Sequence, residues 1–340
     1  MKVLLIGGTG VISTSVTRRL IRLGWEVTLL NRGMRPLPED IQGSIHVLTA
    51  DVNDEPAVGA LLKDKWFDVV CNFIVYTPEQ ARRDIRLFSG KTAQYVFISS
   101  ASAYHKPVEQ LPIREETPLH NPYWAYSDLK AQCEQTLLSA YREAQFPVTI
   151  VRPSHTYCER SLPVQIHGGH GPWVIMKRMM EGKSVPVASD GNTLWTVTTA
   201  EDFAVYFCAL LGNSDAIGEA FHITSDESLT WNRIYQIIAD CVGGQFIPCY
   251  VPAHLLAESV QYDYRGSLLG DKAYTVIFDN SKVKNTTGIH DHGRTSFAEG
   301  AKRSVAYFLA HPEIRQEDPT FEVFCDQLET AMDQVKKQLK

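Results

Sequence analysis

The chain has 340 residues, a length that suits two domains or one large domain with an appended lobe. Hydrophobic residues make up 44% and charged residues 21%, and this composition excludes a mostly disordered chain. The net charge is −6, with 33 Lys and Arg against 39 Asp and Glu, so the chain lacks the basic surplus typical of nucleic-acid-binding proteins.

The first 150 residues alternate short β-branched runs with helical patterns. Strands are expected at 2–6, 26–30, 45–49, 68–73, 95–99 and 148–152, and helices at 14–23, 55–63, 78–88 and 125–144. Apolar strands that alternate with amphipathic helices indicate βαβ units. The sequence therefore predicts an α/β fold with a Rossmann-type, doubly wound parallel sheet that helices cover on both faces.

The pattern changes after residue 153. A stretch rich in Gly, Pro and His precedes a helix at 201–211, a strand at 220–224, a helix at 231–241 and a loop-rich region at 245–295. From Phe321 to Leu339, apolar residues recur at steps of three and four, which predicts a helix packed on the body, with an oligomer contact as the alternative. We assign 1–153 to a dinucleotide-binding domain with 196–220 packed back on it, 154–195 and 220–295 to a smaller α/β substrate lobe, and 296–340 to C-terminal helices.

Cysteine usage and hydropathy bear on the compartment and the partners. The seven cysteines are scattered and form no Cys-x-x-Cys pair, which favours reduced thiols over a disulfide framework or a zinc site. The apolar run at 3–6 is too short for a signal peptide, and no later run reaches membrane length. We expect a cytoplasmic protein that acts on a small molecule and binds no metal, membrane or nucleic acid; whether it forms a homodimer is left open.

A glycine-rich turn directly follows the first expected strand and directly precedes a helix. Glycines in such a turn let backbone N–H groups approach a pyrophosphate, and the helix N-terminus favours that anion. Ser13 stands where the third glycine of the motif is usual; it is small, and its hydroxyl can bond a phosphate oxygen. The alternative is a tight turn that binds nothing. The residues that we assign to a dinucleotide here are Gly7, Thr9, Gly10, Val11 and Ile12.

The ends of the second and third strands bear on which dinucleotide binds. An NAD site usually places Asp or Glu after the second strand, where it takes the ribose hydroxyls. Here Asn31 stands in that place, and Arg32 and Arg35 can meet a 2′-phosphate, so the sequence favours NADP over NAD; solvated arginines are the alternative. Asp51 and Val52 follow the third strand, where the carboxylate can accept from the adenine amino group or cap a helix.

Tyr126 and Lys130 stand four residues apart on an expected helix and therefore share one face. Free tyrosine has a pKa of about 10, and a nearby ammonium together with an oxidised nicotinamide would lower it toward the working range of a base. Upstream, an expected strand ends in Ser99 and Ser100. A serine at this end of the sheet can hydrogen-bond the substrate oxygen that exchanges its proton with Tyr126, with a loop cap as the alternative.

With these motifs in this order, the sequence resembles the extended and atypical short-chain dehydrogenase/reductases, the NAD(P)-dependent nucleotide-sugar epimerase/dehydratase family. The resemblance spans residues 1 to about 240 and rests on the motifs at 7–13, 51–52, 72–73, 97–104, 126–130, 151–153, 195–204 and 221–224. It continues without an attached mechanism at 266–272 and 278–281. The resemblance implies an epimerase or reductase that transfers hydride at a secondary alcohol or ketone of a sugar-like substrate.

The resemblance also implies residue roles. Tyr126 would be the general acid/base, Lys130 would hold the nicotinamide ribose and tune Tyr126, and Ser100 would bind the substrate oxygen, with Ser99 as its substitute. Trp195 is assigned to the substrate, with core burial as its alternative. The remaining contacts that we expect are Asn72, Phe73, Ser99 and Pro153 with the cofactor, and Tyr76, Ser102, Tyr123 and His155 with the substrate.

Departures from the family pattern narrow the reaction. The 4,6-dehydratases carry an Asp-Glu pair after the strand-end serine or threonine, whereas this chain has Ala101 and Ser102, so we do not expect dehydratase chemistry by that route. His155 replaces a common Asn, which weakens a nucleotide-sugar assignment. Residues 72–76 resemble the atypical branch that includes chloroplast stem-loop RNA-binding proteins. The alternative function is therefore a non-catalytic NADP sensor or an RNA-associated protein.

Overall fold

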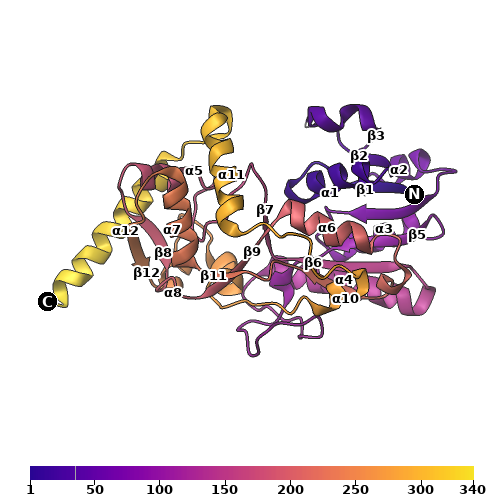
Figure 1. Ribbon diagram of the computed structural model, residues 1–340. Helices are drawn as coiled ribbons and strands as arrows, with labels where there is room; N and C mark the ends of the chain where they lie inside the picture. The colour runs from indigo at the N-terminus through magenta and orange to yellow at the C-terminus, as the bar shows by residue number, and fades with distance from the viewer. Residues whose placement is uncertain (35) are drawn as a thin grey trace.

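The computed structural model describes residues 1–34 and 36–340. A parallel sheet wrapped by helices forms one end of the molecule and contains the N-terminus (Figure 1). A smaller lobe forms the other end, and the last helix extends outward from it.

The main sheet has seven strands in the order β10-β6-β5-β4-β1-β2-β3, and every neighbouring pair is parallel. The Rossmann-type fold expected from the sequence is thus confirmed. The chain leaves β1 toward β2 on one side and returns to β4 on the other, so the strand order reverses between β1 and β4. Ligands bind at such a switch point in doubly wound sheets. The strands are β1 (Lys2–Ile6), β2 (Glu26–Asn31), β3 (Ile45–Thr49), β4 (Phe67–Asn72), β5 (Thr92–Ile98), β6 (Val148–Pro153) and β10 (Ala220–Ile223).

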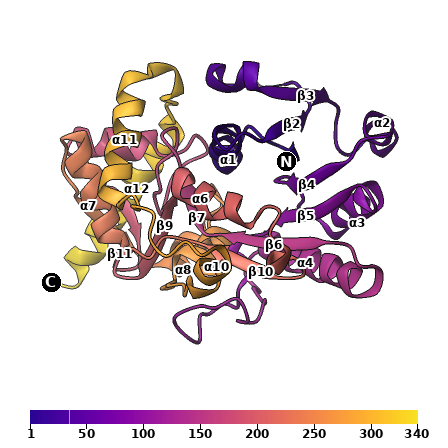
Figure 2. The ribbon, with the colours of Figure 1, turned by 45° about the vertical axis from the view of Figure 1, so that its right-hand side comes forward.

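Helices cover both faces of this sheet because its strands are apolar on both faces. Val3 and Leu5 of β1 pack in the core shared with α1 and α6, whereas Leu4 and Ile6 pack in the core shared with α2, α3 and α4. Figure 2 shows α3 and α4 together on one side and α1 and α6 on the other. These helices are α1 (Val11–Arg22), α2 (Glu55–Leu61), α3 (Pro78–Phe88), α4 (Ala125–Ala144) and α6 (Ala200–Leu210).

The lobe contains a three-stranded sheet in the order β11-β9-β7 and the parallel pair β12-β8. Its strands are β7 (His155–Tyr157), β8 (Val185–Ala188), β9 (Leu194–Thr199), β11 (Ser228–Thr230) and β12 (Pro248–Val251). Its helices are α5 (Trp173–Met180), α7 (Trp231–Val242), α8 (Ala253–Ala257), α9 (Arg265–Ser267), α11 (Phe297–Ala310) and α12 (Pro319–Gln338). Short helical turns occur at Glu39–Ser44, Ala101–Ala103, Ser214–Ala216, Leu268–Lys272 and Pro312–Ile314.

Two C-terminal segments differ from the sequence-based expectation. Helix α10 (Ser281–Thr287) places Val283 in the core under α1 and α6, so this part of 220–295 packs against the main sheet. In α12, Phe321 and Phe324 are buried, but Val335 is 47% and Leu339 is 83% exposed, so only the first half of the helix docks on the body. Strand β10 likewise belongs to the main sheet although 220–295 was assigned to the lobe, so we retain the expected domain boundaries as a proposal except at β10 and α10. No helix among the described residues is both long and apolar enough to cross a membrane.

Candidate functional site

The turn after β1 is built to leave its backbone open to a ligand. Gly7 has φ +80, and a Cβ added there would lie 2.8 Å from Ile74 Cγ2, so the position requires glycine. Ser13 Oγ donates to the Gly7 carbonyl (2.7 Å) and accepts from the Gly10 N–H (2.8 Å). The serine therefore closes the turn itself, and its hydroxyl is not free to bond a phosphate in the way that we had expected.

A cavity of about 660 Å³ runs from this turn along the carboxyl ends of the strands to α4. Its volume falls in the range of small-molecule and cofactor sites, about 300–1,000 Å³. The predicted cofactor residues that line it are Gly7, Thr9, Gly10, Val11, Ile12, Asn31, Arg32, Asp51, Val52, Phe73, Ser99, Tyr126, Lys130 and Pro153. The structure thus brings together residues from the ends of six strands, β1 to β6.

Two predicted cofactor residues stand apart from this set. Arg35 lies outside the described residues. Asn72 is fully buried and does not line the cavity; its amide donates to Asp84 (2.6 Å), and its carbonyl oxygen accepts from the Ile74 N–H (2.9 Å). Asn72 therefore shapes the turn after β4 from below, and we no longer assign it a direct cofactor contact.

The side chains after β2 and β3 lie at the end of the cavity away from α4. Each accepts a hydrogen bond from a backbone N–H of the loop that follows its strand. Asn31 Oδ1 accepts from the Gly33 N–H (3.1 Å), and Asp51 Oδ1 accepts from the Asn53 N–H (2.9 Å). Asp54, rather than Asp51, caps α2. Arg32 is exposed at the cavity wall and forms no ion pair with any residue that the structure describes.

Lys130 is buried on α4, at the end of the first cavity that lies next to this helix. Its ammonium donates to the carbonyls of Val75 (2.6 Å) and Ile98 (2.8 Å) and lies 4.7 Å from the centroid of the Tyr76 ring. Burial lowers the pKa of Lys130 to about 8. An ammonium has three N–H donors, and these two carbonyls use two of them. One donor therefore remains for a ligand in the cavity.

Burial and the Ser100 hydroxyl set the state of the Tyr126 hydroxyl within the protein, and the expected effect of an oxidised nicotinamide on its pKa stays a prediction. Burial raises the pKa of Tyr126 to about 12, and the Ser100 hydroxyl is the group that lowers it. The ammonium of Lys130 lies 5.7 Å from the centroid of the Tyr126 ring, and two of its three donors bond carbonyls rather than the Tyr126 hydroxyl. In this protein Tyr126 is therefore a protonated phenol near neutral pH, able to donate a proton to a substrate oxygen.

Three serine hydroxyls form a chain that ends beside Tyr126. Ser127 Oγ donates to Ser102 Oγ (2.7 Å), and Ser102 Oγ and Ser100 Oγ are 2.8 Å apart. Because Ser102 Oγ accepts from Ser127, it can pass its own hydrogen to Ser100. Ser100 Oγ also accepts from the Ser102 N–H (3.2 Å), so the Ser100 hydrogen is left to donate to Tyr126 or to a substrate oxygen.

A second cavity of about 310 Å³ lies between this serine chain and the lobe. Tyr126 and Pro153 line both cavities and so mark where they meet. Of the predicted substrate residues, Ser100, Ser102 and His155 line the second cavity, whereas Tyr76 lines the first. Lining residues that sequence reasoning missed include Trp124, Asp271, Lys272, Val276 and Phe278.

Two other predicted substrate residues line neither cavity. Trp195 is 1% exposed and stacks on Trp231 with ring centroids 5.3 Å apart, so the structure corrects our substrate assignment and places Trp195 in the lobe core. Tyr123 is partly buried and packs against that same core.

His155 does line the second cavity. Burial lowers the pKa of His155 to about 3, so this imidazole is neutral near pH 7.

The family model described as "NAD dependent epimerase/dehydratase family" matches residues 3–224, which is more than half of the chain. The chain belongs to this family. The matched residues include the glycine turn, the serine chain and Tyr126 with Lys130, whereas Asp271, Lys272, Val276 and Phe278 of the second cavity lie beyond the matched range.

Curated relatives of this family member are about a quarter identical to it over the aligned residues. A 2′-dehydrokanamycin reductase of Streptomyces kanamyceticus is 26% identical over 77% of this chain and 72% of its own length. A chloroplast stem-loop binding protein of Arabidopsis thaliana is 27% identical over 71% of this chain and 63% of its own length. A UDP-glucose 4-epimerase of Lactobacillus helveticus is 28% identical over 45% of this chain and 51% of its own length.

Solved structures support the same fold. An epimerase from Methanothermobacter thermautotrophicus superposes with a TM-score of 0.74 at 18% identity, covering 92% of this chain and 94% of its own. A dTDP-glucose 4,6-dehydratase from Bacillus anthracis, solved in complex with NAD, also gives 0.74 at 18% identity, covering 92% and 98%. Since both reaction types occur on this fold, the fold alone does not choose between them.

The site of this epimerase/dehydratase family member fits the dinucleotide that the family uses. A Cβ at Gly8 would lie 2.6 Å from Leu29 Cδ2, as the Cβ at Gly7 would lie against Ile74, so the backbone of the turn packs too closely for any side chain but hydrogen. Helix α1 begins at Val11, directly after the turn, and its N-terminus borders the first cavity. Its first turn carries no acidic residue that would repel a pyrophosphate.

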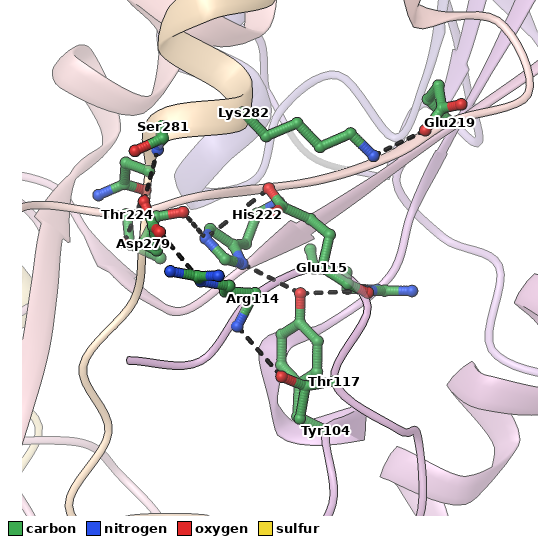
Figure 3. A network of polar contacts seen from close by, with 12 residues as sticks. Tyr104, Arg114, Glu115, Thr117, Glu219, His222, Thr224, Asp279, Ser281 and Lys282 are labelled. Carbon is green, nitrogen blue, oxygen red and sulfur yellow. Dashed lines mark hydrogen bonds and ion pairs between the residues drawn. The ribbon is translucent and has the colours of Figure 1, made fainter. Parts of the chain in front are cut away.

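A buried polar network supports the strand end that carries the serines. Ser99 Oγ donates to Glu134, and the Arg152 guanidinium bonds Glu134 (2.6 Å from Nη2) and the Tyr104 hydroxyl (3.0 Å from Nη1). Tyr104 in turn lies 3.0 Å from His222 Nδ1, and His222 Nε2 lies 2.8 Å from the Asp279 carbonyl (Figure 3). The network thus connects β5 and α4 to β6, β10 and the segment before α10.

Proposed function

We propose that this protein is an NAD(P)-dependent oxidoreductase or epimerase that transfers hydride at a secondary alcohol or ketone carbon of a sugar-like substrate. The observation that carries the proposal is the position of Tyr126, which borders both the cofactor-sized cavity and the second cavity. A substrate held in the second cavity would present its oxygen to the Tyr126 hydroxyl while its carbon faces the first cavity. A nicotinamide, when bound, supplies the acceptor and the donor of the hydride.

In this proposal the chain's own groups bind, orient and move a proton. The turn after β1 holds the pyrophosphate with backbone N–H groups, and the remaining donor of Lys130 binds a ribose hydroxyl. Ser100 donates to the substrate oxygen, and the proton moves between that oxygen and Tyr126 Oη. The positive charge of an oxidised nicotinamide ring beside Tyr126 would lower the pKa of this hydroxyl from its buried value.

For the cofactor we propose NADP ahead of NAD. Asn31 offers no carboxylate at the end of β2, and the exposed Arg32 is available there for a 2′-phosphate. We also propose epimerase or reductase chemistry ahead of 4,6-dehydratase chemistry. Ala101 and Ser102 line the second cavity at the positions where that dehydratase route requires acidic residues.

The non-catalytic alternative is not favoured. A cofactor sensor needs the glycine turn, but it does not need a serine chain and a Tyr–Lys pair that meet beside a second cavity. The net charge of −6 likewise gives little attraction to RNA. We further propose a homodimer, supported by the exposed end of α12, and a cytoplasmic location, supported by seven free cysteines.

A matched pair of variants tests the proposed function. Tyr126→Phe removes one oxygen and should lower hydride transfer by at least about 100-fold, because general acid catalysis is lost, while NADP affinity changes little. Tyr123→Phe is the control, since Tyr123 lines neither cavity. Turnover is followed by nicotinamide absorbance over a panel of sugars and nucleotide sugars, and NADP binding by fluorescence. Full turnover in Tyr126→Phe would refute the proposal.

A further inference from the structure

Asp271 places a carboxylate in the wall of the second cavity, which Tyr126 also lines. Among the described residues, no side chain or backbone N–H donates a hydrogen bond to this carboxylate, and it forms no ion pair at contact distance. Its charge nevertheless reaches Tyr126, because Asp271 is one of the groups that raise the pKa of that hydroxyl. Asp271 is half-buried, and its carboxylate keeps acceptor positions that a ligand hydroxyl in the cavity can use.

The segment that carries Asp271 is fixed in place from both sides. Asn121 donates to the Gly270 carbonyl (2.7 Å), and Trp231 Nε1 donates to the Lys272 carbonyl (3.1 Å). Gly270 packs so closely that an added Cβ would lie 2.8 Å from Trp124 Cβ. The turn Leu268–Lys272 is π-helical, a geometry that occurs frequently at functional sites. The carboxylate is therefore presented rigidly, as a recognition group must be.

Two lysines set the charge around Asp271. Burial raises the pKa of Asp271 to about 6, and the charges of Lys106 and Lys272 act against that rise, so the carboxylate is mostly ionised near pH 7. Lys106 is 1% exposed, and its ammonium has no hydrogen-bond partner in the described chain. Burial lowers the pKa of both lysines, that of Lys272 to about 8, but their positive charge near pH 7 offsets the attraction of Asp271 for a substrate ammonium and leaves a neutral hydroxyl as the favoured donor.

The rest of the second cavity argues against a diphosphate inside it. Lys272 is the cationic residue in its described lining, and its ammonium already donates to the carbonyls of Val164 (3.0 Å) and Gln165 (3.3 Å). His155 is neutral, and Asp271 would repel an anion. The cavity volume of about 310 Å³ is at the small end for ligand sites.

We propose that Asp271 is a specificity-determining residue that accepts a hydrogen bond from a ring hydroxyl near the reacting carbon, and that the substrate enters this cavity as a neutral hydroxylated ring without a diphosphate. This inference rests on the proposed function, because it takes the reacting oxygen to lie at Ser100 and Tyr126.

The test uses the full chain loaded with NADP. Binding of the methyl α-pyranosides of glucose, mannose and galactose, of UDP-glucose and of glucosamine is measured by saturation-transfer NMR in the wild type and in Asp271→Asn. Asp263→Asn is the control, because Asp263 lies exposed on the surface of the same lobe. We expect at least one methyl pyranoside to bind more tightly than UDP-glucose and glucosamine, and Asp271→Asn to weaken it by about 10- to 100-fold, as expected for a hydrogen bond to a charged group. Asp263→Asn should have no effect.

A second readout needs no substrate. In protein labelled with [13C]tyrosine, the Tyr126 signal is identified by its loss in Tyr126→Phe, and Asp271→Asn should lower the pKa of Tyr126 because a negative charge is removed. Three results would each overturn the inference. They are unchanged pyranoside binding in Asp271→Asn, tighter binding of UDP-glucose or glucosamine than of every methyl pyranoside by the wild type, and no pyranoside binding to the wild type. If Tyr126→Phe abolishes turnover while Asp271→Asn leaves KM unchanged, this inference fails and the proposed function stands; full turnover in Tyr126→Phe removes the proposed function itself.

Discussion

The pair formed by Glu134 and Arg152 should be among the most sensitive positions in the chain. Glu134 is 1% exposed and Arg152 is 4% exposed, and the guanidinium approaches the carboxylate at 2.6 Å (Nη2–Oε2) and 2.9 Å (Nε–Oε1). Glu134→Gln keeps the shape but removes the negative charge, which leaves the Arg152 cation buried without a counter-charge. Breaking a buried pair from one side costs about 3–5 kcal/mol, a large share of the roughly 5–15 kcal/mol that stabilise a folded domain.

A surface pair of the same geometry provides the control for this prediction. Arg86 bonds Glu55 through Nε (2.9 Å) and Nη2 (2.7 Å), but both side chains are exposed to solvent. Water screens such a pair, so Glu55→Gln should leave the free energy of unfolding unchanged within error. Urea unfolding at pH 7, followed by circular dichroism and tryptophan fluorescence, gives both values. If Glu134→Gln is no more destabilising than Glu55→Gln, burial does not give the pair the weight that we assign to it.

Three further changes test other parts of the site. Gly7→Ala should weaken NADP binding by about 10-fold or more, because a Cβ meets Ile74 at 2.8 Å in a φ region that disfavours alanine; unchanged affinity in a fluorescence titration would contradict this. Arg32→Ala should weaken NADP by about 10-fold but leave NAD unchanged, and an equal effect on both would remove the argument for a 2′-phosphate. Burial lowers the pKa of His222 from 6.5 to about 4, so the unfolded chain takes up this proton first, and His222 alone should contribute a loss of about 2 kcal/mol between pH 7 and pH 5, beside the contribution of other buried histidines such as His155. His222→Gln should lose less in urea unfolding over that interval; equal losses would show that His222 does not titrate as we describe.

Local signals explain why the first half of the fold could be predicted closely. Helix α3 matches its predicted bounds, because Thr77 and Gln80 form a capping box and Pro78 opens the first turn. By contrast, the sequence predicts a loop-rich region at 245–295, whereas the structure has β12 there. That strand pairs with β8, more than sixty residues earlier in the chain, and periodicity within a window carries no information about such a partner.

The same distinction applies to the site. The glycine turn and the Tyr126–Lys130 spacing are local, and the structure places all of these residues at the first cavity. The surroundings of Asn72 and Trp195 depend on Asp84 and Trp231, which only the folded chain brings near them. Asp271 reaches Tyr126 across 145 positions of sequence, the difference between their residue numbers. A single sequence therefore shows the chemistry of one strand end but not which distant segment closes the site.

The two adjacent serines after β5 have different roles, which the sequence alone does not assign. Ser99 is 2% exposed and commits its hydrogen to Glu134, so it joins the buried pair with Arg152 and holds the strand end. Ser100 accepts from Ser102 and keeps its own hydrogen at the second cavity, where Tyr126 lies. A hydroxyl whose donor is already bound to a buried carboxylate cannot also serve a substrate oxygen without breaking a charge-assisted bond. Ser100 is therefore the hydroxyl available for recognition, and the stability of the buried pair beneath Ser99 determines how firmly Ser100 is held there.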